Sequence, residues 1–196
     1  MRWTFAGDFY VDNELQYDYV SFTVWGEVPE IEGNIRFSNE VFVLEESVEE
    51  FKSKLENAVE ISDEIYQILR MEDGIPLYGI DMDETTIVPE LGLDGLISYN
   101  KGCYIGQEII ARIYFRGHVA KQMKGLVLSG ELGVESRELK TVDGKSAGKI
   151  TAVCYSPKLG KHIALGYVRY DYLADGTELK IGETTAIVKN LPFIEK

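Results

Sequence analysis

Hydrophobic and polar positions alternate along the first part of the chain, which is the period of a β-strand. Apolar side chains recur at every second position from Val20 to Val24, in a stretch rich in β-branched and aromatic residues. Polar residues 38–40 separate two further apolar runs and favour a hairpin turn. The predicted strands are residues 17–25, 35–37 and 41–44.

The period then changes to that of an amphipathic helix. Ser47 and Glu50 have the spacing of a capping box, in which two side chains satisfy backbone N–H groups at a helix start. The helix is predicted to run from Ser47 to about Glu60. Apolar residues recur at every fourth position and are expected to face inward: Phe51, Leu55 and Val59.

Ser62 is the predicted N-cap of a second helix, which ends before Gly74. Its inward face is predicted to carry Ile65, Ile68 and Leu69. Residues 74–99 have no regular period and contain Pro76 and Pro89. Such a stretch indicates either a loop-rich wall around a site or a plain connecting segment.

The last third of the chain returns to strand patterns after one more helix, predicted over residues 107–115. Turn signals separate short strands at residues 125–128, 148–155, 163–168, 178–181 and 184–188. Several short strands at regular spacing predict a small antiparallel β-barrel. The predicted fold class is α+β, with a mixed sheet-and-helix domain over residues 1–117 and a β-barrel over residues 118–196.

Composition narrows the possible functions. The 196 residues carry 20 basic and 33 acidic side chains, a net charge of −13 that repels phosphate backbones and argues against broad nucleic-acid binding. No apolar run approaches the roughly 20 residues that span a bilayer. Two cysteines, Cys103 and Cys154, form neither a disulfide framework nor a zinc-finger spacing, which suits a reducing cytoplasm.

The most distinctive stretch reads KGCYIGQE at residues 101–108. Cys103 is expected just before a helix N-terminus, where the helix dipole and Lys101 favour the thiolate form. Gly102 and Gly106 permit close approach of a flat ligand to the main chain. The alternative is a small buried residue that packs a tight turn, the commoner fate of cysteine. Cys154, in an apolar strand, is expected in the core.

This octapeptide resembles the signature of the YgfZ-type folate-binding proteins, relatives of the glycine-cleavage T-protein, an aminomethyltransferase. Residues 69–79 and 89–93 resemble two further motifs of that superfamily, and residues 148–192 resemble its C-terminal barrel. The resemblance implies a folate-binding-type domain ahead of the barrel, with a shortened N-terminal half. It also implies tetrahydrofolate or a folate derivative as the ligand.

The resemblance gives site residues by position. Cys103 is the reactive thiol, assisted by Lys101, and Glu72 matches the acid that holds the pterin edge. The implied folate-binding set is Arg70, Glu72, Asp81, Gly102, Tyr104, Gly106, Gln107, Glu108 and Arg112. The alternative for the charged members is surface charge, and Glu108 and Arg112 have the i, i+4 spacing of a helical ion pair. No metal-ligand motif occurs, so no metal site is predicted.

Three functions remain open. The first is a folate-binding protein that supports iron–sulfur cluster assembly or repair, and indirectly tRNA modification, with iron–sulfur client or assembly proteins as partners. The second is tetrahydrofolate-dependent aminomethyl transfer, and the third is a non-catalytic scaffold. Family members usually exceed 300 residues, and no residue here can be assigned to the catalytic aspartate of the T-protein's N-terminal half. A second subunit, in a homo-oligomer, would be one way to complete the pocket.

Overall fold

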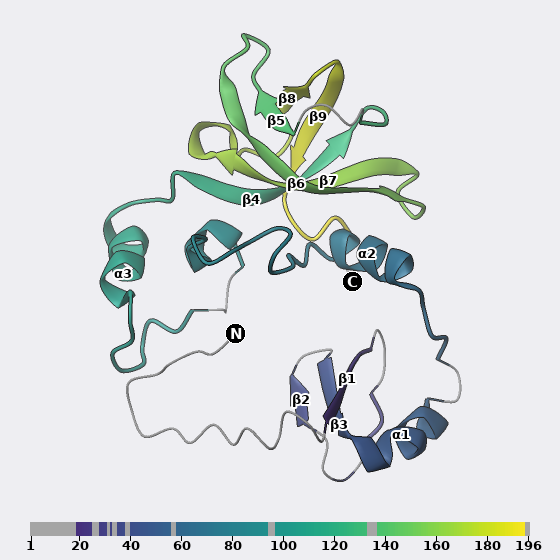
Figure 1. The fold of residues 1–196 in the computed structure, drawn as a ribbon. Helices are drawn as coiled ribbons and strands as arrows, with labels where there is room; N and C mark the ends of the chain where they lie inside the picture. Colours follow the sequence, from purple (N-terminus) through teal and green to yellow (C-terminus); the bar gives the residue numbers. More distant parts are fainter. Residues whose placement is uncertain are drawn as a thin grey trace. The chain divides into compact units, whose positions relative to one another are not determined.

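The structure, a computed structural model, describes residues 19–24, 28–30, 32, 35–37, 40–55, 58–93, 97–132 and 137–194. The chain forms two compact units, Met1–Glu60 and Ile61–Lys196 (Figure 1). Each unit has its own hydrophobic core. The mixture of helices with a closed antiparallel barrel confirms the predicted α+β class.

The first unit contains a three-stranded antiparallel sheet in the order β1-β3-β2. Its strands are β1 (Tyr19–Thr23), β2 (Ile35–Phe37) and β3 (Glu40–Leu44), which confirms the three predicted strands. Val41, Val43 and Phe51 are fully buried between this sheet and the following helix. Phe37 of β2 pairs with Glu40 of β3, as expected for a hairpin, and the turn predicted between them falls on residues 38 and 39, outside the described residues.

Helix α1 (Val48–Lys54) is shorter than predicted and follows a 3-10 turn, η2 (Glu45–Ser47). The predicted capping box is wrong, because Ser47 has a helical backbone conformation and its side chain makes no capping hydrogen bond. Glu50 instead forms an ion pair with Lys54 at 2.8 Å. Val59 lies beyond the end of the helix and is 83% exposed, so its predicted inward position is also wrong.

Helix α2 (Asp63–Glu72) begins where predicted, since the Ser62 hydroxyl accepts a hydrogen bond from the Ile65 N–H. Ile65 itself is 46% exposed, contrary to its predicted inward position. The buried part of α2 is its last turn, which includes Met71. The helix ends in a Schellman motif, in which Gly74 adopts φ 71° and its N–H bonds to the Met71 carbonyl.

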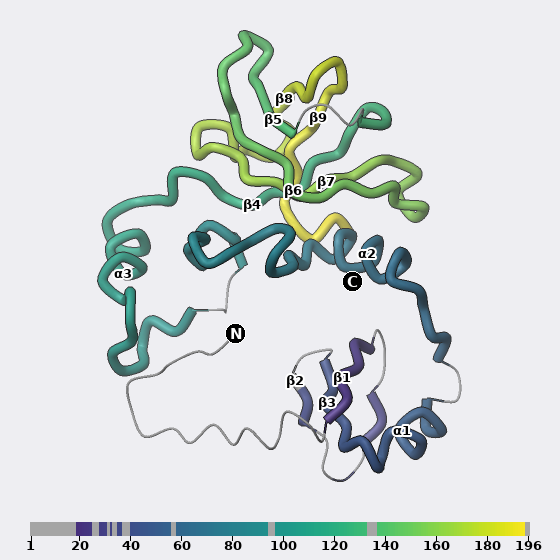
Figure 2. The backbone as a smooth tube through the Cα atoms, viewed as in Figure 1, coloured from purple at the N-terminus to yellow at the C-terminus, as the bar shows by residue number. Residues whose placement is uncertain are grey.

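An irregular segment runs from α2 past a short 3-10 turn, η3 (Val88–Leu91), to helix α3 (Gln107–Arg116). The predicted third helix is confirmed, and Gly106 precedes it in a left-handed conformation with φ 88°. Figure 2 shows that α2 and the residues that follow it run along one side of the barrel. Helix α2 contacts strands β6 and β7 there.

The barrel closes in the strand order β4-β7-β6-β5-β8-β9, with β9 paired to β4. Its strands are β4 (Lys121–Leu128), β5 (Glu138–Lys140), β6 (Ser146–Ser156), β7 (Lys161–Arg169), β8 (Glu178–Ile181) and β9 (Thr184–Lys189). Five of these strands match the predicted runs, and β5 was not predicted. Strand β5 escaped prediction because charged residues flank its one buried side chain, Leu139.

The barrel has a filled interior and one covered outer face. Alternate residues of its strands, such as Leu126 and Val188, point inward and are fully buried. On the outside, Ile163 and Leu165 of β7 pack with Met71 of α2 and with Phe193, which follows β9. This packing joins α2 to the barrel in one unit.

The predicted domain boundary at residues 117 and 118 does not coincide with the division between compact units, which falls between Glu60 and Ile61. Residues 61–120 lie in the same unit as the barrel, and α2 contacts β6 and β7 there. The predicted boundary does lie close to the first barrel strand at Lys121. As a division between domains it stays a prediction.

Candidate functional site

The KGCYIGQE turn lies at the start of α3, as the sequence predicted, and Cys103 is an exposed free cysteine. The interpretation of Cys103 as a buried packing residue is therefore wrong. A Cβ added at Gly102 or Gly106 would meet no atom within 4 Å, so the turn is open on the side of both glycines. The Lys101 ammonium lies 5.0 Å from the centre of the half-buried Tyr104 ring.

Helix α3 continues this open surface. The Glu108 carboxylate and the Arg112 guanidinium form an ion pair at 2.8 Å, with side chains 85% and 69% exposed. None of the helix residues is buried, and Ile105 and Ile109 present 86% and 57% of their surface. Gln107, the first residue of the helix, is half-buried. The exposed predicted residues thus lie on the turn that contains Cys103 and on the helix that directly follows it.

Arg70 and Asp81 occupy a different environment, inside the protein. Their side chains are 2% and 0% exposed and form an ion pair of 2.7 Å between Nη1 and Oδ2. The same guanidinium donates to the Ile75 carbonyl at 3.0 Å, and Asp81 also accepts from the Leu77 N–H at 3.0 Å and from the Thr151 hydroxyl. Each charge is therefore paired and hydrogen-bonded, as a buried charge must be. This network fixes the start of the irregular segment against strand β6.

Glu72 is also buried, and its carboxylate accepts a hydrogen bond from the Ser156 hydroxyl at the end of β6. The Ser156 oxygen in turn accepts from the Leu159 N–H at 3.1 Å. Burial and the nearby Glu72 charge raise the pKa of Cys154 to about 11, while Arg70 opposes the shift. Cys154 packs in the cluster around Met71, so it is a neutral packing residue at neutral pH.

The structure thus divides the predicted site residues into two groups. Arg70, Glu72 and Asp81 lie in and just after α2, whereas the other predicted residues lie on the turn and helix α3, and Figure 1 shows α2 and α3 at different ends of this unit. A common folate-binding role of both groups stays a prediction. Sequence reasoning missed the hydroxyls of Thr151 and Ser156, because strand β6 carries other polar side chains, such as Lys149, and nothing in its pattern distinguishes these two.

No group of three or more His, Cys, Asp or Glu side chains in the described ranges is placed to hold a metal ion. Over the same ranges, no helix has the length and apolar character needed to cross a membrane.

Comparison with known families identifies the barrel. Residues 121–193 match the family described as the glycine cleavage T-protein C-terminal barrel domain. That match covers the region from the first strand of the closed barrel to Phe193, which packs against it.

Curated relatives match a larger part of the chain. A putative chloroplastic transferase of Arabidopsis thaliana is 32% identical over 142 residues, which is 72% of this chain and 32% of the relative. An aminomethyltransferase of Thermosynechococcus vestitus is 40% identical over 114 residues, 58% of this chain and 31% of the relative. The human mitochondrial aminomethyltransferase is 30% identical over 133 residues, 64% of this chain and 33% of the relative. The chain spans about a third of the length of these relatives.

A solved structure shows the same fold. The glycine cleavage system aminomethyltransferase T of Bartonella henselae superposes with a TM-score of 0.67 at 23% identity, covering 80% of this chain and 46% of that protein. Together the matches support the superfamily of the glycine cleavage T-protein. They do not separate the YgfZ-type branch from the aminomethyltransferases.

Proposed function

We propose that this chain binds a reduced folate, tetrahydrofolate or a derivative, through the surface formed by the KGCYIGQE turn and helix α3. One observation carries the proposal. A barrel of the T-protein type is joined directly to an exposed turn with open glycines and a free cysteine. Aminomethyltransferases among the relatives favour folate chemistry over the scaffold alternative.

The exposed groups are of the kinds that a folate needs. A pteridine is flat and presents N–H groups in one plane, which suits the Glu108 carboxylate and the open main chain at Gly102 and Gly106. The glutamate tail of a folate is anionic, and Lys101 and Arg112 supply exposed positive charge. Arg70, Glu72 and Asp81 are buried and hydrogen-bonded inside the second unit, and direct ligand contact by them would require these bonds to open.

Transfer of a one-carbon unit is not part of the proposal. No residue of this chain is assigned to the catalytic aspartate, and the chain spans about a third of its relatives. A partner subunit of the same chain would supply more of a pocket, and a mass measurement by light scattering tests that homo-oligomer directly. We place the protein in the cytoplasm, where both of its free cysteines would stay reduced.

Calorimetric titration of the full chain with 5-formyl-tetrahydrofolate tests the proposal. We expect saturable binding that Arg112→Ala weakens and Arg116→Ala leaves nearly unchanged, since both arginines lie on α3 but only Arg112 pairs with Glu108. Absence of binding at high micromolar ligand, with the chain folded by circular dichroism, would favour the scaffold. Equal effects of the two substitutions would refute the proposed location of the site, but they would not refute folate binding itself.

Support of iron–sulfur enzymes is the second candidate, and the exposure of Cys103 favours it. One thiol cannot hold a cluster alone, because clusters need about four protein ligands, so the role would be transient or shared with a client protein. Activity of iron–sulfur enzymes and of the tRNA modifications that depend on them should fall in cells that carry Cys103→Ala. Cells that carry Cys154→Ala are the matched control, and equal activity in both would contradict this role.

A further inference from the structure

A cleft opens on the barrel where strand β4 parts from strand β7. Strand β4 pairs with β7 as far as Val127, opposite Ile163, whereas its pairing with β9 begins at Gly125 and continues beyond that point. The Ser129 N–H donates to the Thr185 carbonyl at 2.9 Å, and the Thr185 N–H donates to the Ser129 hydroxyl at 3.1 Å. Strand β7 meanwhile stays paired with β6. The two halves of the sheet therefore diverge and leave a gap between them.

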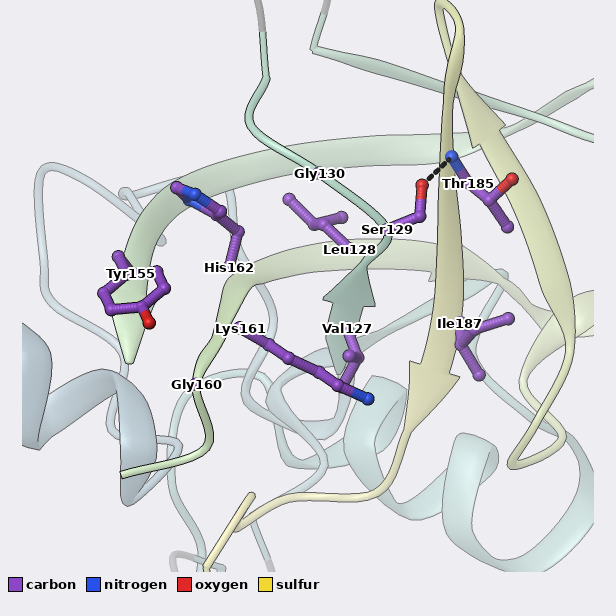
Figure 3. A pocket seen from close by; sticks show the side chains of 10 residues that line it. All are labelled: Val127, Leu128, Ser129, Gly130, Tyr155, Gly160, Lys161, His162, Thr185 and Ile187. Atoms are coloured by element: carbon purple, nitrogen blue, oxygen red, sulfur yellow. Dashed lines mark hydrogen bonds between the residues drawn. The ribbon is translucent and has the colours of Figure 1, made fainter. Parts of the chain in front are cut away.

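The gap is a cavity of about 620 Å³, within the range of small-molecule sites. Figure 3 shows its two walls and the side chains that line it. The lining residues are Val127, Leu128, Ser129, Gly130, Tyr155, Gly160, Lys161, His162, Thr185 and Ile187. A second cavity of about 320 Å³ adjoins it and shares Val127, Lys161 and Ile187. The aliphatic floor thus continues from one cavity into the other.

Charge in this cleft is opposite to that of the whole protein. None of the residues that line the two cavities is acidic, although acidic side chains outnumber basic ones 33 to 20 in the chain. Lys189 in the second cavity is paired with Asp175 at 3.1 Å. Lys161 forms no ion pair within the described part of the chain, and Figure 3 shows its side chain extending across the opening toward Ile187.

The far end of the main cavity offers an aromatic surface. Tyr155 and His162 lie edge to face there, with ring centres 5.2 Å apart and planes at 64°. Rings in this arrangement can accept a further flat ring against them. The cleft therefore combines an aliphatic floor, an aromatic end wall and the ammonium of Lys161, which has no ion-pair partner among the residues that the structure describes.

We propose that this cleft binds a small organic anion with a flat apolar body, namely an aromatic carboxylate. The ring lies on Val127 and Ile187 toward the Tyr155–His162 pair, and the carboxylate pairs with Lys161. Charge complementarity selects an anion, because a cationic or neutral ring of the same shape would leave Lys161 unpaired. The site is independent of the folate surface, since none of its residues belongs to the KGCYIGQE turn or α3.

Amide chemical shifts of the full, isotope-labelled chain during titration with 1-naphthoate test the proposal. We expect saturable shifts at Ser129, Gly130, Gly160 and Thr185, with a dissociation constant on the order of 1 mM or below. 1-Naphthylmethylammonium, which has the same ring and the opposite charge, should produce no saturable shifts at these amides.

Two matched substitutions locate the charge. Lys161→Gln should weaken naphthoate binding about three- to five-fold, the size of effect of a solvent-exposed ion pair. Lys158→Gln removes the same charge from the adjacent turn, outside the cavity lining, and should change the affinity little. Ile187→Glu places a carboxylate on the floor and should abolish binding.

Four outcomes would overturn the proposal. These are the absence of saturable shifts, shifts confined to α3, equal binding of the cationic probe, and equal effects of the two lysine substitutions. A failed folate titration with naphthoate still bound at these amides would refute only the proposed function. Folate binding without saturable naphthoate shifts at these amides would refute only the cleft between β4 and β7.

Discussion

Removal of the Asp81 carboxylate is expected to destabilise the second unit strongly. Arg70 and Asp81 are paired at 2.7 Å with side chains 2% and 0% exposed, so Asp81→Ala leaves a guanidinium buried without its counter-charge. Breaking a buried pair on one side costs about 3–5 kcal/mol. The Leu77 N–H also loses its side-chain acceptor in this variant, whereas the Thr151 hydroxyl keeps the Leu165 carbonyl at 3.2 Å, so we expect a loss within that range.

Equilibrium unfolding in urea measures this loss. With a slope of about 2 kcal/mol per molar, the midpoint should fall by about 1.5–2.5 M. Both tryptophans, Trp3 and Trp25, lie in the first unit, so tryptophan fluorescence would report on the wrong part of the chain. Amide resonances of β7 residues, such as Ile163, follow the barrel directly.

Glu108→Ala is the matched control, because it breaks the same carboxylate–guanidinium pairing at the surface, where the partners are 85% and 69% exposed. Its midpoint should match that of the wild type. A double variant, Arg70→Met with Asp81→Leu, should recover part of the stability that Asp81→Ala loses, since neither charge is then buried alone. If Asp81→Ala moves the midpoint no further than Glu108→Ala does, the buried network does not stabilise the unit as argued.

Iodoacetamide at pH 7 should modify exposed Cys103 and spare Cys154, whose pKa is raised to about 11, and mass spectrometry that finds equal labelling would contradict this. The same raised pKa predicts a stability change: unfolded Cys154 loses its proton first, so the unfolding free energy should fall between pH 9 and pH 11 relative to Cys154→Ala, and a constant difference would refute it. Gly148→Ala should prevent barrel folding, because its Cβ would lie 2.1 Å from the Tyr167 carbonyl oxygen, whereas Gly117→Ala, with its nearest atom at 3.8 Å, should fold; circular dichroism that shows both folded would contradict the clash.

Local patterns predicted most of the fold. Strands with several alternating apolar residues and the helix capped by Ser62 follow from contacts between near neighbours in sequence. The errors arose where position in the fold decided the outcome. Val59 continues the helical spacing of apolar residues, but helix α1 ends at Lys54, before it reaches Val59. Leu139 is buried because the barrel closes around it, and no local alternation of apolar residues indicates this.

The site was harder to predict than the fold. The turn around Cys103 is visible in the sequence because its signal is local. The hydroxyls that bond to Asp81 and Glu72 belong to Thr151 and Ser156, which lie 70 and 84 residues further along the chain. No local pattern in or after α2 could show that the Glu72 and Asp81 carboxylates accept hydrogen bonds from hydroxyls of strand β6.

The order of the barrel strands has a consequence for the route of the chain. Strand β4, the first of the barrel, pairs with β9, the last, with Gly125 opposite Lys189. The points where the chain enters and leaves the barrel are therefore neighbours. This arrangement would let the barrel be inserted into another chain, provided that α2, whose Met71 covers the outer face of β7, is transplanted with it.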